Sequence, residues 1–209
     1  MKRLAVAFVA AVTAWSSCIS SLASAGEPRT HDGFFLRLSA GYGSATSKFE
    51  EPGLAEELSG SGSADLNFAV GAMIRPNLAI HGTMWGWLLE DPDLELATAG
   101  NPTMMGTLDG DVDMSAYGGG LTYYFMPLNV YLTGSAGFAT LTVSGSDNVS
   151  TETDSGFALD LGIGKEWWVG NSWGLGLNGG YSYHSVPEHG SSDNWSGSSY
   201  AVRFSATLN

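Results

Sequence analysis

Residues that could perform nucleophilic catalysis lie close together near the C-terminus, in Ser182-Tyr183-His184-Ser185 and at Glu188. On an extended segment, Ser182 and His184 are two residues apart and therefore face the same side. The imidazole could take the hydroxyl proton while the Glu188 carboxylate orients the ring, as in a hydrolytic triad. A serine-rich loop also brings Ser, His and Glu together by chance, so a polar loop without catalysis is the competing interpretation.

A second group of polar side chains interrupts otherwise apolar, alternating segments and is predicted to point into a shared interior. Its members are Arg37, Arg203, Glu166, His81, Asn178 and Asp160. Charges removed from water persist when they are paired and hydrogen-bonded. We therefore expect a structural polar plug in which Glu166 bridges Arg37 and Arg203. A proton or ion path would use the same residues and remains an alternative.

Neither a dedicated metal site nor a cofactor is predicted. Asp109-Gly110-Asp111-Val112-Asp113 is similar to the start of a calcium loop, but Met114 and Gly120 occupy the positions that require Gly and Glu. This excludes an EF-hand and leaves loose divalent binding by acidic loops open. Trp85 and Trp87 share an inward face, where they either fill space or line a small apolar pocket.

The elements that must position these residues are strands. In the segment 64–75 every even position is apolar, and Asp65, Asn67, Gly71 and Arg75 are among the odd ones, which is the period of a strand with one apolar face. The predicted strands cover about 33–46, 63–75, 78–90, 112–125, 129–143, 156–169, 173–184 and 197–208. Long connections near 47–62, 91–111, 144–155 and 185–196 alternate with short turns at 76–77, 126–128 and 170–172.

Alternation fits a membrane barrel with its apolar face outward and a soluble barrel with that face inward. Aromatic residues near strand ends, charges on the polar face and the alternation of long and short loops favour the membrane. Lys165 has the parity of the lipid-facing Leu161 and Ile163. We expect it to reach the interface from its place near a turn, unless a bulge exchanges it with Glu166.

The chain here resembles the small eight-stranded outer-membrane barrels of the OmpA/OmpX type. The resemblance covers about 31–209, with the opening strand Gly33–Gly43 as its typical feature. It implies an all-β fold, an eight-stranded antiparallel up-and-down transmembrane β-barrel with loops outside and turns in the periplasm. It also implies a Gram-negative outer membrane, contact with lipid and lipopolysaccharide, insertion by the barrel-insertion machinery, and a monomer.

The N-terminus is predicted to be a signal peptide over 1–25, ahead of a barrel domain over 26–209. Lys2 and Arg3 precede an apolar stretch, and Ala23-Ser24-Ala25 is a small-residue cleavage motif. Cys18, the one cysteine, lies within the signal, so we expect no disulfide in the mature chain. Cleavage removes two of eight basic residues and none of the 21 acidic ones. We therefore expect no nucleic-acid partner, because an acidic surface repels the phosphate backbone.

These observations favour a non-enzymatic outer-membrane protein with a structural or surface-interaction role, carried by four acidic, Gly/Ser-rich extracellular loops. A porin-like channel is disfavoured because side chains fill an eight-stranded lumen. Two alternatives stay open. One is a lipid-modifying hydrolase using Ser182 and His184, and the other is a carrier of small hydrophobic molecules with Trp85 and Trp87 at its mouth.

Overall fold

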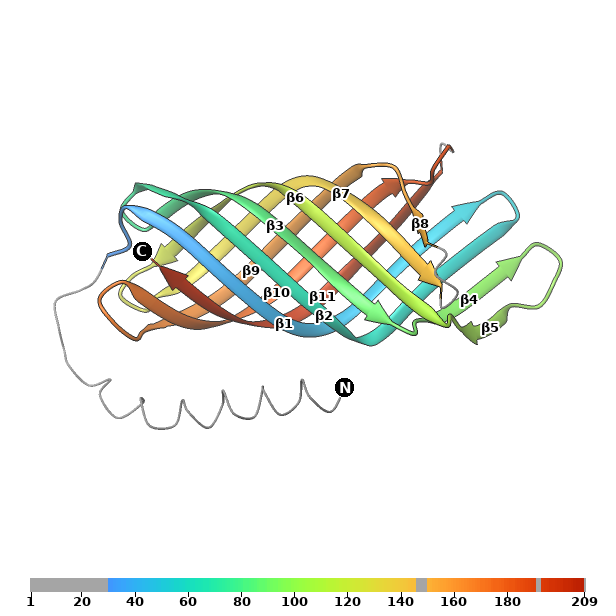
Figure 1. Ribbon diagram of the computed structural model, residues 1–209, viewed down its shortest axis with the longest axis horizontal. Coiled ribbons are helices and arrows are strands. Elements are labelled where there is room, and N and C mark those ends of the chain that lie inside the picture. Colours follow the sequence, from blue (N-terminus) through green and yellow to red (C-terminus); the bar gives the residue numbers. More distant parts are fainter. Residues whose placement is uncertain (1–29, 146–149, 191–192, 209) are drawn as a thin grey trace.

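The alternating segments form the eight long strands of a closed antiparallel barrel in a computed structural model, which describes residues 30–145, 150–190 and 193–208 (Figure 1). The wall consists of β1 Phe34–Glu51, β2 Leu54–Arg75, β3 Leu78–Glu90, β6 Gly110–Phe125, β7 Val130–Gly145, β9 Gly156–Trp168, β10 Trp173–Pro187 and β11 Asn194–Leu208. The connections carry three short strands, β4 Asp93–Thr98, β5 Met104–Thr107 and β8 Ser150–Glu152. The predicted fold class is confirmed. The predicted signal peptide, with Cys18, lies outside the described residues.

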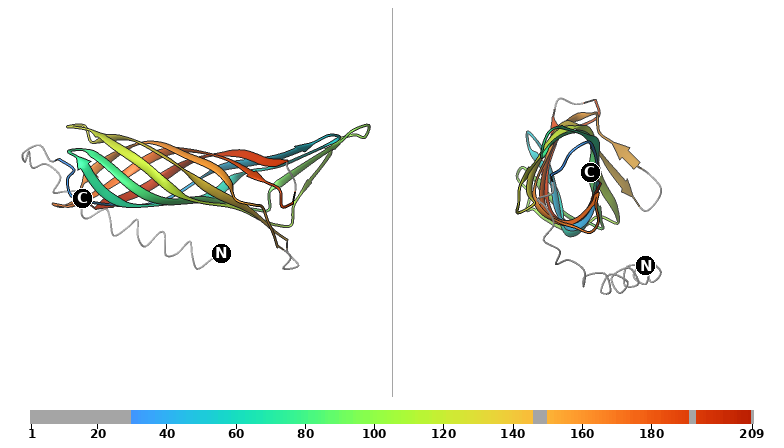
Figure 2. Two further views of the ribbon diagram at one scale, coloured as in Figure 1. Left: turned by 90° about the horizontal axis from the view of Figure 1, so that it is seen from above. Right: turned by 90° about the vertical axis from the view of Figure 1, so that its left-hand side faces the viewer.

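The barrel closes because β1 pairs with both β2 and β11. Figure 2 shows the resulting ring in its end-on view. Following the paired residues around the wall from Ser47 returns to β1 at Arg37, ten residues lower on the strand. A stagger of this kind goes with strands tilted by roughly 35–45°. Among the described residues no helix is long and apolar enough to cross a membrane.

The ends of the barrel differ, as the connection lengths predict. Three short turns join β2 to β3, β6 to β7 and β9 to β10, and we call this side the short-turn end. At the opposite, long-loop end the strands run well past the ring (Figure 2). The expected long loop at 47–62 is wrong: β1 and β2 continue as a paired hairpin that turns at Pro52 and Gly53. Gly53 has a φ of 94°, which suits glycine at such a tight turn.

The outward face is apolar and is bordered by aromatic side chains. Toward the long-loop end, the Tyr181 and Tyr200 rings lie 5.0 Å apart and those of Tyr117 and Phe138 6.4 Å apart. At the short-turn end, exposed Trp167 joins a second group that includes Tyr123, Phe125 and Trp173. Two aromatic girdles around an apolar band are the arrangement that a bilayer requires.

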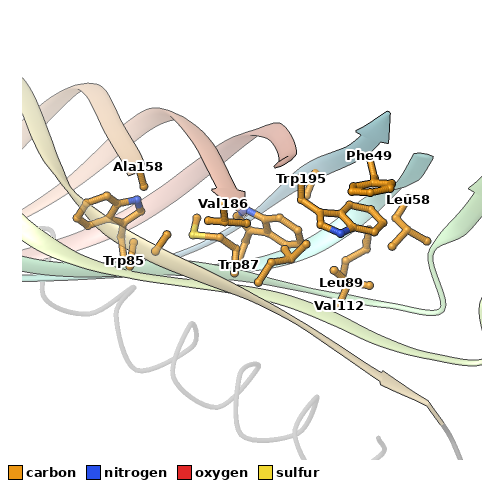
Figure 3. Close-up of a cluster of buried hydrophobic side chains, with 14 residues drawn as sticks. Phe49, Leu58, Trp85, Trp87, Leu89, Val112, Ala158, Val186 and Trp195 are labelled. Atoms are coloured by element: carbon orange, nitrogen blue, oxygen red, sulfur yellow. The ribbon is translucent and has the colours of Figure 1, made fainter. Parts of the chain in front are cut away.

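The interior is divided into an apolar part and a polar part. Toward the long-loop end, Trp85, Trp87 and Trp195 are the largest members of a cluster of buried apolar side chains, which we call the mouth cluster (Figure 3). The cluster also contains Phe49, Leu58, Leu89, Val112, Met114, Leu141 and Val186, with four alanines. The charged side chains lie nearer the short-turn end, together with a small cluster of Phe35, Ala69, Ala79, Tyr124 and Tyr131.

Candidate functional site

One polar cluster lies at the short-turn end of the lumen and is centred on Arg37. Its guanidinium donates to the Tyr124 hydroxyl at 2.7 Å and lies 3.5 Å from the Glu166 carboxylate. Glu166 also accepts from Thr207 at 2.6 Å and from the Tyr124 hydroxyl at 3.2 Å. The Arg37 guanidinium carbon lies 4.0 Å from the centre of the Tyr131 ring. All five side chains are buried, so the charges are neutralised inside the barrel.

A second polar cluster surrounds Arg203 on β11. Its guanidinium makes two hydrogen bonds to Asp65 on β2, of 2.5 and 3.1 Å, and two to Asp160 on β9, of 2.7 and 3.2 Å. Asn67 donates to Asp160 at 3.1 Å. The expected bridge from Glu166 to both arginines is therefore replaced by two clusters. Asp65 is the partner that the sequence reasoning missed, although its polar parity in β2 was visible.

The two remaining residues of the expected plug are also buried. His81 Nε2 lies 3.1 Å from the Thr122 hydroxyl. Asn178 faces the lumen at 5% exposure, and its Oδ1 has no hydrogen-bond partner among the described residues. Glycines make room for the large side chains: a Cβ at Gly180 would lie 2.7 Å from the Arg203 guanidinium, and one at Gly164 would lie 2.4 Å from the Tyr131 ring.

Ser182, His184 and Glu188, the residues of the alternative hydrolase, do not come together as a triad. His184 Nε2 lies 3.0 Å from the hydroxyl of Ser47, on β1, rather than bonding Ser182. The Ser182 hydroxyl has no hydrogen-bond partner among the described residues. Glu188 accepts a hydrogen bond from the Trp195 indole instead of orienting the imidazole. Ser47, Ser182 and His184 are at most 1% exposed, so this arrangement offers a substrate neither an assembled triad nor access.

The mouth cluster fills the lumen where a carrier would need an apolar pocket. Trp85 and Trp87 are each only 3% exposed and pack among Met114 and Ala116. A hollow of about 770 Å³ borders this wall, and its lining includes both tryptophans as well as outward Leu66 and Met84. Because the tryptophans are almost fully covered and Leu66 and Met84 are more than 60% exposed, the open surface of the hollow lies on the outward face.

Lys165 points outward near the short-turn end, without a bulge that exchanges it with Glu166. The pairing of β9 with β10 runs without a register shift through both residues. The ammonium group bonds the Leu128 carbonyl in the neighbouring turn and lies 5.6 Å from the Trp167 ring centre. This contact with the turn is how a lysine on a lipid-facing strand reaches the interface.

Above the ring at the long-loop end, the hairpin of β1 and β2 continues into β4 and β5. β4 pairs with β2, and β5 pairs with β4. We call these four paired segments the extension sheet, which Figure 1 shows projecting at the right of the barrel. Its inner face continues from the mouth cluster, because Leu58 pairs with Leu94 and Glu56 with Leu96. Its outer face is charged.

Electrostatics differ between the two faces of the extension sheet. On the outer face the Lys48 ammonium lies 2.7 Å from Glu57, and this contact raises the pKa of the lysine. On the inner face burial raises the pKa of Glu56, and the charge of Glu188 raises it further. Segments 47–62 and 91–111 together carry nine carboxylates and one basic residue, Lys48. In the described residues no group of three His, Cys, Asp or Glu side chains could hold a metal ion.

A closed barrel with aromatic girdles, an ion-paired polar lumen and projecting loop strands defines the class of a membrane-spanning β-barrel. The family model for the outer membrane protein beta-barrel domain matches residues 8–207, and the chain belongs to this family. It is a protein of the bacterial outer membrane. The short-turn end therefore faces the periplasm and the long-loop end the exterior.

Several solved structures are similar to this chain. Neisserial surface protein A shares 15% identity, with 84% of this chain and 96% of that chain covered and a TM-score of 0.49. Ail, the attachment invasion locus protein of Yersinia pestis, shares 16% identity, with 84% and 99% covered and a TM-score of 0.45. OprG from Pseudomonas aeruginosa shares 12% identity, with 86% and 98% covered and a TM-score of 0.46. Among curated proteins, none matches this chain.

Proposed function

We propose that this barrel is a non-enzymatic surface-interaction protein, which presents acidic strands and loops to cationic partners outside the cell. The carrying observation is the extension sheet, which projects from the barrel with six carboxylates against one lysine: Glu50, Glu51, Glu56, Glu57, Asp93 and Glu95 against Lys48. A field of one sign steers oppositely charged partners and raises their rate of association. Among the described residues, Ser182 and His184 are buried apart from Glu188 and side chains pack the mouth, which favours this role over the hydrolase and the carrier.

The experiment measures adhesion of phosphatidylcholine vesicles that contain the full-length protein to surfaces coated with polylysine, polyglutamate or dextran. Adhesion to polylysine is the expected result. It should fall at least fivefold in a variant with amides at Glu50, Glu51, Glu57, Asp93 and Glu95. A control variant, in which exposed serines and threonines of the same segments become asparagine, keeps the charge and should adhere like the parent. Equal adhesion of all three proteins would contradict the proposal.

The same proposal makes a separate statement about catalysis. Lipid A from cells that express the protein should have the same mass spectrum as lipid A from cells that express His184→Ala. Loss of an acyl chain that depends on His184 would replace the proposal with the lipid-modifying hydrolase.

A further inference from the structure

β5 is an edge strand at the tip of the extension sheet, and its two largest side chains are apolar and exposed. Among the described residues it pairs with β4 alone. Met104 and Met105 are 68% and 80% exposed. Natural proteins usually protect exposed edges with lysine, proline, a bulge or a covering loop. The sequence of β5, Met104-Met105-Gly106-Thr107, contains none of the protective residue types.

The ladder identifies which backbone groups of β5 are unpaired. Leu108 N–H donates to Pro92 O at 2.9 Å, just beyond the paired Asp93 and Thr107. Bonded and non-bonded pairs alternate along an antiparallel ladder. The pairs Leu94 with Gly106 and Leu96 with Met104 are therefore bonded. Met105 and Thr107 turn their N–H and C=O groups to the free edge.

The backbone hydrogen bonds between β4 and β2 agree with this assignment of bonded pairs. Ala99 N–H donates to Gly53 O at 2.9 Å, in register with the pairing of β4 and β2. By the same alternation, Glu95 and Asp93 direct their backbone groups to β2 and away from β5. The free edge is thus ready to accept another strand without breaking a bond of the sheet.

The side chains beside this edge indicate which strand would fit. On the outer face, Met105 stands beside exposed Glu95, and Thr107 stands beside exposed Asp93. A residue opposite Met105 or Thr107 could lean its ammonium or guanidinium group toward one of these carboxylates. On the inner face, Met104 follows Leu96 in the row that begins at Phe49, so the intervening residues of an added strand would meet apolar side chains.

We propose that β5 is a docking edge for an extended segment of another protein, with basic and apolar residues in alternation. The segment adds as a further strand to the extension sheet. Its backbone bonds Met105 and Thr107, while its basic side chains face Glu95 and Asp93. This mode of recognition takes affinity from the main chain and specificity from alternate side chains. The inference rests on the proposed surface-interaction role and names the partner of that surface.

The test uses the full-length protein in phosphatidylcholine nanodiscs and a fluorescent ten-residue peptide of alternating Lys and Val. Binding is measured by anisotropy, with empty nanodiscs as the blank. Met105→Pro removes one edge N–H and leaves the bonds to β4 in place, since proline is tolerated where the N–H faces solvent. Met105→Ala is the matched control, because it removes the same side chain and keeps the N–H. Each variant must first show a heat-modifiable band on gels.

We expect the Lys/Val peptide to bind, and Met105→Pro to weaken it at least tenfold relative to Met105→Ala. A Glu/Val peptide should not bind. A Lys/Val peptide N-methylated at every lysine should bind the parent protein as weakly as the unmodified peptide binds Met105→Pro, because the lysine amides face β5 when the lysine side chains lie beside Glu95 and Asp93. Equal binding by Met105→Pro and Met105→Ala would overturn strand addition. If polylysine adhesion still depended on the loop carboxylates, the proposed function would stand without this docking mode. Loss of both effects would reject the two proposals together.

Discussion

Replacing Arg203 with methionine should be among the most destabilising single changes in the lumen. The guanidinium makes four hydrogen bonds to Asp65 and Asp160, and the three residues are at most 2% exposed. Its removal leaves two carboxylates facing each other without a counter-charge. Breaking a buried ion pair by removing one partner costs roughly 3–5 kcal/mol of unfolding free energy. Asp65→Asn keeps an acceptor and leaves Arg203 paired with Asp160, so we expect a loss of about 1 kcal/mol.

The assay is urea unfolding of the full-length protein in phosphatidylcholine vesicles, followed by tryptophan fluorescence, under conditions where unfolding and refolding curves coincide. Ser205→Ala is the matched control: it lies on the same strand and face, and its hydroxyl has no hydrogen-bond partner among the described residues. The uncharged combination of Arg203→Met, Asp65→Asn and Asp160→Asn should recover most of the loss, because removing the whole network removes the unpaired charge. A loss for Arg203→Met no larger than that for Ser205→Ala would refute this account of the cluster.

Three further changes test other parts of the molecule. Trp195→Ala should cost roughly 3 kcal/mol in the same urea assay and increase iodide quenching of the remaining tryptophans, because it opens the mouth cluster; unchanged quenching would contradict the packing. Ile163→Lys places a charge on the lipid face and should lower the unfolding free energy by roughly 2–4 kcal/mol. Lys165→Leu should change the unfolding free energy by less than about 1 kcal/mol. Similar effects of the two substitutions would contradict the interfacial placement of Lys165. The hydrogen bond and the charge of Asp154, 2.9 Å away, raise the pKa of His189. The ion pair between the two side chains is therefore fully formed at pH values below the usual histidine pKa, and it is lost as pH rises through the raised pKa. An NMR titration midpoint of His189 that Asp154→Asn leaves unmoved would disprove the pairing.

The strands were predictable because alternation and turn residues specify each one locally. The hairpin beyond the ring was not. The segment 47–62 has many acids and glycines, and Leu54 and Leu58 are too sparse there to make an apolar stripe. Outside a bilayer, a ladder needs no apolar outward face. Backbone pairing with neighbouring strands that are already in register is sufficient to extend the hairpin. The sequence of one strand does not show whether such neighbours are present.

Which side chains pair within the lumen depends on the relative heights of residues on different strands, and the sequence of a single strand does not show these heights. Parity placed Arg37, Arg203 and Glu166 on inward positions, and all three are buried. Their pairing depends on depth, and depth counted from the turns neglects the ten-residue stagger around the barrel. The stagger puts Asp65 rather than Glu166 within reach of Arg203. Height in the barrel also decides whether an inward side chain joins the polar or the apolar layer. On β3, for example, His81 is buried near the periplasm, whereas Trp85 and Trp87 are buried near the mouth.

The apolar layer lies above the polar layer in the lumen, and this order bears on whether ions could pass through the barrel. A path for ions through the charged lumen requires water at both ends, but the mouth cluster lies between Arg203 and the exterior and leaves its tryptophans almost fully covered. The same packing gives the extension sheet a rigid base, because Leu58 belongs to the mouth cluster and pairs across to Leu94. A strand added at β5 would thus join a sheet anchored in the barrel core. Little of its binding energy would be spent on ordering the receptor, which is the condition under which a small edge can bind a partner specifically.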